Sequence, residues 1–298
     1  MRIGVSTACF SAAFPKLRKD PLGSARRILN PNLELLATQE AVRKLSLTGF
    51  ELAYRRFMQV GLVHCSVLTT HGPVFASFED GWKQAKTAES LVHRSIGILI
   101  PLLFGWDFQR TDRIAADFGA FHIIHAGTAA KLLKRGDSIL GSGRRKSEWL
   151  VEADWVEWEE GKPPKRGVWK PEEVISLTDR LGMGTLLDTS RTQIMSLPLR
   201  ETLEAYGKRV KALHISGAVA GQSEDGGLAL FPEAATERNR SAYRRSLSEI
   251  KELLQSVRGR NLPLIIELSF TTRRGDPEEG VERSVRFIRD ALANIGQV

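Results

Sequence analysis

The sequence predicts an α/β protein built as a single (β/α)8 barrel, with one domain over residues 1–298. Three observations support this fold class. Eight short β-rich segments alternate with segments of helical pattern. Most of the eight are nearly continuous apolar runs, as expected of parallel strands covered on both faces. The length suits one barrel of this kind, and no linker, repeat or low-complexity segment interrupts it.

The expected strands are short, and most end near a polar or ionisable side chain. Their hydrophobic pattern and composition identify them: β-branched and other apolar residues dominate each run, and turn-forming residues lie at its two ends. In order they are Arg2–Ala8, Gly49–Tyr54, His64–His71, Phe121–Gly127, Glu148–Asp154, Gly184–Ser190, Val210–Ser216 and Leu262–Ser269.

Amphipathic segments between these strands predict the helices. Pro171 and Pro277, each followed by two glutamates, are typical helix starts, and Gly182 is a typical stop. The segment 241–259 has apolar residues at helical spacing: Leu247, Ile250, Leu253, Leu254 and Val257. The expected helices are 33–47, 80–99, 170–182, 199–209, 241–259 and 277–295.

Composition narrows the functional classes. The apolar run Ser95–Trp106 is too short to span a bilayer and contains a proline, so we expect a buried helix and no membrane partner. The N-terminus has no signal-peptide pattern, and the two cysteines, Cys9 and Cys65, are too few for a disulfide framework. We therefore expect a cytoplasmic protein. The net charge of +8 favours anionic partners, either phosphorylated metabolites or nucleic acid, although a solvated basic surface also explains it.

Six ionisable or imidazole side chains fall near the carboxyl ends of the expected strands: His71, His125, Glu152, Asp188, His214 and Glu267. In a barrel these strand ends meet on one face, the face that carries active sites. Three buried carboxylates would repel one another without a counter-ion, so the pattern predicts one or two divalent cations, Mn²⁺, Zn²⁺, Co²⁺ or Mg²⁺. Taken singly, each residue has a structural alternative, such as a hydrogen-bonded core histidine or, for Asp188, a helix cap.

The series Glu152, Asp188, His214 and Glu267 on strands five to eight resembles the xylose isomerase-like superfamily of TIM barrels. That superfamily contains sugar isomerases, ketose 3-epimerases, inosose dehydratases and endonuclease IV, of AP endonuclease family 2. The resemblance implies that the four residues hold one divalent metal, and that Glu152 and Glu267 also form the acid–base pair. It thus implies an isomerase or epimerase of a small anionic or polyhydroxy substrate, a sugar or sugar phosphate.

The same resemblance supplies an alternative function. In endonuclease IV, histidines after strands three and four hold a further zinc together with the shared glutamate, and His71 and His125 match those positions here. A second metal would favour a phosphodiesterase acting on nucleic acid. The departures argue against it, because Arg191 stands where the endonuclease has a histidine, and the loop after strand seven contains no histidine.

Basic side chains border the expected pocket. Arg191 follows strand six, and Arg273 follows strand eight within the loops that surround an active-site face. A guanidinium binds phosphate or carboxylate through its planar fork, so both are candidate substrate-binding residues. The structural alternative for Arg191 is a surface ion pair. The long polar loop after strand seven suits either a lid or a surface excursion.

Overall fold

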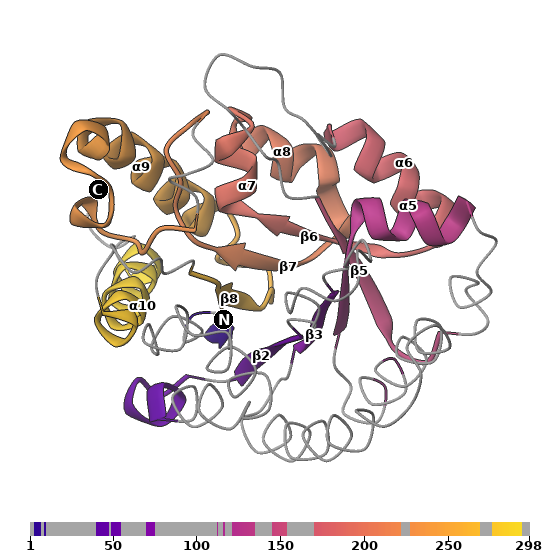
Figure 1. Cartoon of the computed structure of the whole chain (residues 1–298), viewed down its shortest axis with the longest axis horizontal. Coiled ribbons are helices and arrows are strands. Elements are labelled where there is room, and N and C mark those ends of the chain that lie inside the picture. Colours follow the sequence, from indigo (N-terminus) through magenta and orange to yellow (C-terminus); the bar gives the residue numbers. More distant parts are fainter. Residues whose placement is uncertain are drawn as a thin grey trace, which may run out of the picture.

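The computed structural model describes residues 3–6, 9, 40–47, 49–54, 70–74, 112, 116, 121–134, 145–153, 170–221, 227–268 and 276–293 (Figure 1). Strands lie at the centre and helices lie outside them. The strands are β1 (Ile3–Ser6), β2 (Gly49–Tyr54), β3 (Thr70–Val74), β4 (Phe121–His125), β5 (Glu148–Glu152), β6 (Gly184–Asp188), β7 (Val210–Ile215) and β8 (Leu264–Ile266).

The strands pair in chain order, and β8 pairs with β1. Pairing is parallel from β4 through β8 and on through β1 to β2, whereas β3 is antiparallel to both β2 and β4. The α/β class is therefore confirmed. A ring of eight parallel strands is not confirmed, because β3 runs in the opposite direction within the described residues.

The expected third strand, His64–His71, differs from the observed one in position and direction. Residues 64–69 lie outside the described part of the chain, and β3 begins at Thr70. Its register on β4 shifts between His71 and Pro73, where proline has no N–H to donate to the ladder. An apolar run predicts a strand but carries no information about its direction, which explains the error.

The helices are α5 (Ala126–Lys134), α6 (Pro171–Leu181), α7 (Thr189–Ile194), α8 (Leu199–Tyr206), α9 (Arg240–Ser256) and α10 (Pro277–Ala293). The predicted signals at Pro171, Gly182 and Pro277 mark the two ends of α6 and the start of α10. Helices α5 and α7 were not predicted, and each begins where a strand was expected to continue. Helix α6 begins at Pro171, and its first turn is closed by Glu173, whose Oε2 accepts from the Lys170 N–H at 2.9 Å. It ends at Leu181 and is capped by Gly182, which takes the left-handed conformation at φ 59° that glycine adopts without penalty.

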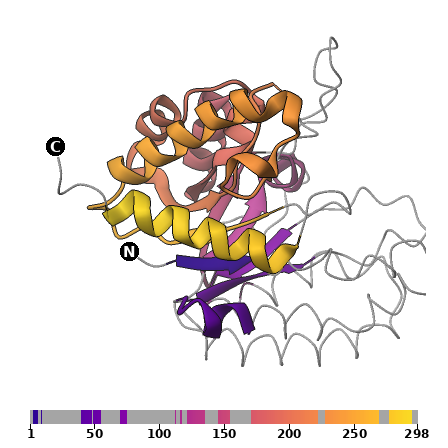
Figure 2. The ribbon, with the colours of Figure 1, turned by 90° about the vertical axis from the view of Figure 1, so that its left-hand side faces the viewer.

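These helices bury their apolar faces against the outer side of the sheet. Helices α9 and α10 contact each other and lie side by side (Figure 2). The predicted apolar positions of α9, Leu247, Ile250, Leu253 and Leu254, are all buried. Within the described residues no helix has the length and apolar character of a membrane span. The helix expected at 80–99 lies outside the described residues, as do residues 33–39 of the one expected at 33–47; of its remaining residues, 40–44 are helical.

Candidate metal centre

Five predicted strand-end residues share one face of the sheet, one side-chain layer above an apolar floor. The floor is a separate buried cluster of Ile123, Leu150, Leu186, Ala212 and Ile265. Side chains alternate between the faces of a strand, so the residue two positions later lies on the same face. Those later residues are His125, Glu152, Asp188, His214 and Glu267. The intervening residues belong to the core beneath the helices: Ile124, Val151, Leu187, Leu213 and Ile266.

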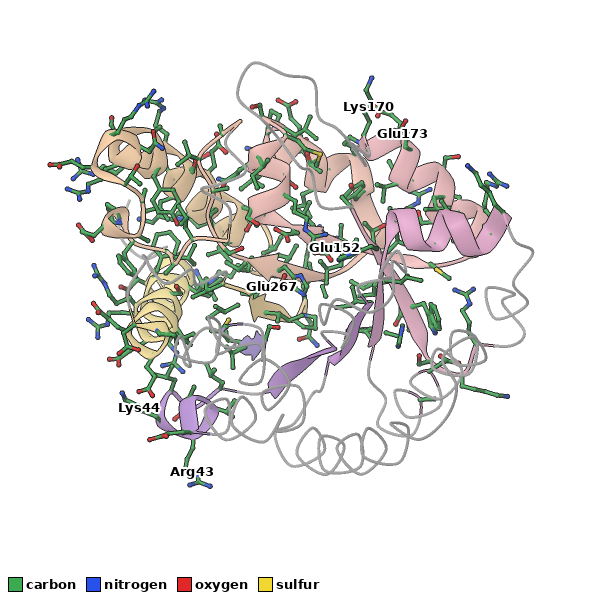
Figure 3. All side chains as sticks on the ribbon, viewed as in Figure 1. Arg43, Lys44, Glu152, Lys170, Glu173 and Glu267 are labelled. Carbon is green, nitrogen blue, oxygen red and sulfur yellow. The ribbon has the colours of Figure 1, made fainter. Side chains whose placement is uncertain are left out.

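Glu152, Asp188, His214 and Glu267 form a compact group. Each offers one ligand atom, and these atoms all lie within 4.8 Å of one another. Three of the residues are buried, whereas Glu267 keeps 17% of its side chain exposed. Their side chains converge from β5, β6, β7 and the end of β8, and Figure 3 places Glu152 and Glu267 near the centre of the molecule, far from the surface pair Arg43 and Lys44.

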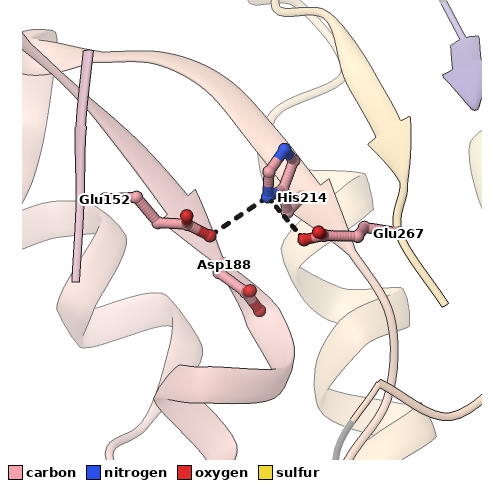
Figure 4. A group of neighbouring side chains, drawn as sticks. All are labelled: Glu152, Asp188, His214 and Glu267. Carbon is pink, nitrogen blue, oxygen red and sulfur yellow. Dashed lines mark hydrogen bonds and ion pairs between the residues drawn. The ribbon is translucent and has the colours of Figure 1, made fainter. Parts of the chain in front are cut away.

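His214 stands between the two glutamates. Its Nδ1 lies 3.1 Å from Glu152 Oε1 and 2.9 Å from Glu267 Oε2 (Figure 4). Because one imidazole nitrogen carries at most one proton, it cannot donate fully to both carboxylates at once. A point between the three groups is therefore rich in electron pairs and suited to a cation.

Asp188 combines two roles. As the N-cap of α7 its Oδ1 accepts from the Arg191 N–H at 3.0 Å and from the Ser190 hydroxyl at 2.9 Å. Burial first, and then the charges of Glu152 and Glu267, raise the pKa of Asp188 to about 6, although Arg191 and His214 oppose the rise. The helix-cap alternative is thus correct, but it does not replace the cluster, because the same carboxyl group belongs to both.

Arg191 is buried beside the cluster, with 7% of its side chain exposed. Its Nε lies 3.2 Å from Asp188 Oδ2, its Nη1 lies 3.3 Å from Glu152 Oε2, and its Nη2 lies 3.3 Å from His125 Nε2. Nη1 also donates to the carbonyl oxygen of Ala153. The alternative of a surface ion pair is therefore wrong: Arg191 pairs with two carboxylates of the buried cluster.

The other predicted residues fall in different places. His125 Nε2 lies 3.2 Å from Glu152 Oε2, on the Arg191 side of that glutamate. The backbone of His71 pairs with Ala53 and with Ile123, so it is level with the apolar floor, one layer below His125. The side chain of His71 and the whole of Arg273 lie outside the described part of the chain.

Cys9 contacts the backbone on both sides of Glu267 in a way that the sequence did not predict. Its buried thiol donates to the Ile266 carbonyl at 3.3 Å and accepts from the Leu268 N–H at 3.2 Å. These two residues flank Glu267, so Cys9 holds the backbone that carries this carboxylate. Only the adjacency of β1 and β8 brings Cys9 to this position, and no local motif around Cys9 marks it.

The residues of the cluster fit a divalent cation. Carboxylate oxygens and an imidazole are ligands that Mn²⁺, Zn²⁺, Co²⁺ and Mg²⁺ accept. Three carboxylates gathered in a buried space repel one another; burial and, to a smaller extent, this repulsion raise the pKa of Asp188, and a cation at their centre would remove the repulsion. The structure is thus an α/β protein with a carboxylate–histidine cluster of metal-binding composition at the carboxyl ends of parallel strands.

Proteins similar to this chain are found among solved structures. No protein-family model and no curated protein matches the chain. Among solved structures, it is similar to a sugar phosphate isomerase/epimerase from Parabacteroides distasonis, with 16% sequence identity over 96% of this chain and 94% of that chain. The TM-score is 0.47.

Proposed function

We propose that this protein is a divalent-metal-dependent isomerase or epimerase of a small sugar or sugar phosphate, with Glu152 and Glu267 as its acid–base pair. One observation carries the proposal: two glutamates approach the same nitrogen of His214, and Asp188 completes a group whose ligand atoms lie within 4.8 Å. The proposal takes the chain as a single (β/α)8-barrel domain that acts in the cytoplasm.

Glu152, Asp188, His214 and Glu267 would hold the ion, which is Mn²⁺, Zn²⁺, Co²⁺ or Mg²⁺ by ligand type. When bound, the ion supplies Lewis acidity that polarises a carbonyl group and its neighbouring hydroxyl and so acidifies the adjacent C–H. The apolar layer beneath the four ligands excludes water from that side. An ion there would therefore be approached by substrate from the side opposite the floor.

Proton transfer then belongs to the two glutamates. One carboxylate removes the proton from carbon, and the other returns a proton to the opposite face or to the neighbouring carbon. Glu267 is the more accessible, with 17% of its side chain exposed against none for Glu152. Glu152 is also held by His125 and Arg191, so its position is fixed. We infer that Glu267 is the more mobile of the pair and meets the substrate first.

The phosphodiesterase alternative stays a prediction with weaker support. It needs His125 beside Glu152, and the two do lie 3.2 Å apart. It also needs a second cation there, yet the guanidinium of Arg191 contacts both of these side chains. The isomerase proposal needs only the group of four residues, which is why we favour it.

Hydrogen exchange at carbon tests the proposal. The metal-loaded protein is incubated in D₂O with a panel of ketoses and ketose phosphates, and deuterium in the recovered sugars is measured by mass spectrometry. We expect incorporation that stops on chelation and returns with Mn²⁺. Glu267→Gln should lower the rate about 10²–10⁴-fold, the usual contribution of a general acid–base group.

The matched control is Glu278→Gln, which removes an exposed carboxylate at the start of α10 and should leave the rate unchanged. Metal content and far-UV circular dichroism are measured for each variant, and the assays contain excess Mn²⁺, so that a lost ion or fold is recognised. Unchanged exchange in Glu267→Gln would show that the acid–base assignment is wrong. If none of the sugars in the panel incorporates deuterium, the proposed reaction is contradicted.

A further inference from the structure

The guanidinium of Arg191 occupies the space next to the proposed metal position. Its three nitrogens each lie within 3.3 Å of a different side chain: Nε near Asp188, Nη1 near Glu152 and Nη2 near His125. Two of these are carboxylates and one is an imidazole, which are the side chains that would surround a second divalent ion. The arginine comes from the first turns of α7, whose N-cap is Asp188 itself, so the helix fixes its position.

Glu152 divides its two oxygens between these two positions. Oε1 lies 3.1 Å from His214 Nδ1, on the side of the four proposed ligands. Oε2 lies 3.2 Å from His125 and 3.3 Å from Arg191. A carboxylate that bridges two metal ions presents one oxygen to each. Here the second oxygen faces a guanidinium instead.

The histidine on this side is also engaged. His125 Nε2 lies within 3.3 Å of both Arg191 Nη2 and Glu152 Oε2. In one tautomer Nε2 accepts a hydrogen bond from the guanidinium, and in the other it donates to the carboxylate. In neither arrangement does Nε2 offer a lone pair to a metal ion while Arg191 stays in place.

The charges lead to the same conclusion. Three carboxylates and one guanidinium, which stays protonated at any physiological pH, leave a net charge of minus two. One divalent ion neutralises that charge. A second would leave an excess of two positive charges in a buried site, where uncompensated charge is strongly disfavoured.

We propose that the Arg191 side chain takes the place of a second cation and restricts this centre to a single divalent ion among Glu152, Asp188, His214 and Glu267. The inference rests on the proposed function, because it presumes that this group binds metal. It assigns Arg191 a positioning role: the arginine orients Glu152 and excludes a second ion. It also gives His125 a different role from that of the metal ligand predicted from the sequence.

Counting bound metal tests this directly. Mn²⁺ equivalents per chain are measured by elemental analysis after removal of excess ion, and Mn²⁺ binding is followed by electron paramagnetic resonance. Wild-type protein should bind one equivalent and give the spectrum of an isolated ion. Arg191→Met, which keeps length but removes the charge, should bind two and show exchange coupling between them. Adding His125→Ala to that variant should return the count to one.

Two further variants serve as controls. Arg191→Lys retains a positive charge in the same space and should stay at one equivalent, and Arg200→Met removes an exposed arginine of α8 and should also bind one. Two equivalents in the wild type, or one in folded Arg191→Met, would overturn the inference and leave the proposed function intact. No binding by folded wild-type protein would instead refute both. If Arg191→Met does not fold, the wild-type spectrum still decides, because a spin-coupled pair contradicts the inference.

Discussion

Replacing Gly217 by alanine should destabilise the protein, because the new methyl group would clash with the side chain of Tyr243. Gly217 follows β7 and exchanges two backbone hydrogen bonds with Leu228, at 2.8 and 2.7 Å, which closes the loop after that strand. A Cβ at this position would lie 2.0 Å from the Tyr243 hydroxyl oxygen and 2.5 and 2.6 Å from two atoms of its ring. Such distances are far below van der Waals contact, so the ring or the loop must move.

The ring of Tyr243 has little freedom to move. It is fully buried in α9, and its hydroxyl donates to the Ala229 carbonyl at 2.8 Å. Overpacking of a filled core costs about 1–3 kcal/mol, and a lost buried hydrogen bond adds about 1 kcal/mol. We therefore expect Gly217→Ala to lower the free energy of unfolding by about 2–4 kcal/mol. For a chain of this length that lowers Tm by about 3–6 °C.

Urea and thermal unfolding followed by circular dichroism measure this effect. Gly259→Ala is the matched control, because no heavy atom lies within 4 Å of the Cβ it would add. It should change stability by less than about 1 kcal/mol. In the double variant Gly217→Ala, Tyr243→Ala the added methyl group finds space, so the two costs should not add. Equal stability of Gly217→Ala and Gly259→Ala would refute the packing argument.

Two further predictions concern carboxyl groups. Because burial and its neighbours raise the pKa of Asp188 to about 6 and only the ionised form binds a cation, Mn²⁺ affinity measured by calorimetry should rise between about pH 5 and 7. The same raised pKa has the opposite effect on the metal-free protein: the stability that protonated Asp188 contributes is complete below pH 3.8 and is lost as the pH rises through about 6. Equal Mn²⁺ affinity at pH 5 and at pH 7 would contradict the assignment of Asp188 as a metal ligand. Asp112 is buried, yet hydrogen bonds, among them one from Trp149 Nε1 at 2.6 Å, outweigh burial and lower its pKa. Asp112→Ala should cost about 2–4 kcal/mol in urea unfolding at neutral pH, and less below the usual aspartate pKa, with exposed Asp290→Ala as the neutral control.

The parallel strands β4 to β8 could be predicted because each joins an apolar run to a polar end. Leu186 and Asp188 illustrate the pattern: two residues apart on one face, one belongs to the floor and the other to the cluster. Alternation then places Glu152 and His214 in the same layer without knowledge of the helices. The predicted ends of the strands were less accurate. Thr189 and Ser190 were expected in a strand, but they begin α7, which Asp188 caps.

Features that depend on contacts between distant segments could not be predicted. The direction of β3 is set by its partners β2 and β4, which its own residues do not encode. The sequence places Arg191 near the pocket, but only the meeting of α7 with the ends of β4 and β5 shows that it faces His125 and Glu152. The contact of Cys9 with the backbone around Glu267 joins residues more than 250 positions apart.

The alternation of the strands would link binding of the proposed metal ion to correct folding. Each of the four proposed ligands comes from a different strand or strand end, so a slip of any strand by a single residue would turn its proposed ligand toward the helices and replace it with a neighbour that is no metal ligand of this kind, such as Val151, Leu187 or Leu213. No partly assembled sheet can therefore offer the complete set. A bound ion would therefore stabilise the chain with correctly paired strands relative to every chain with a shifted register.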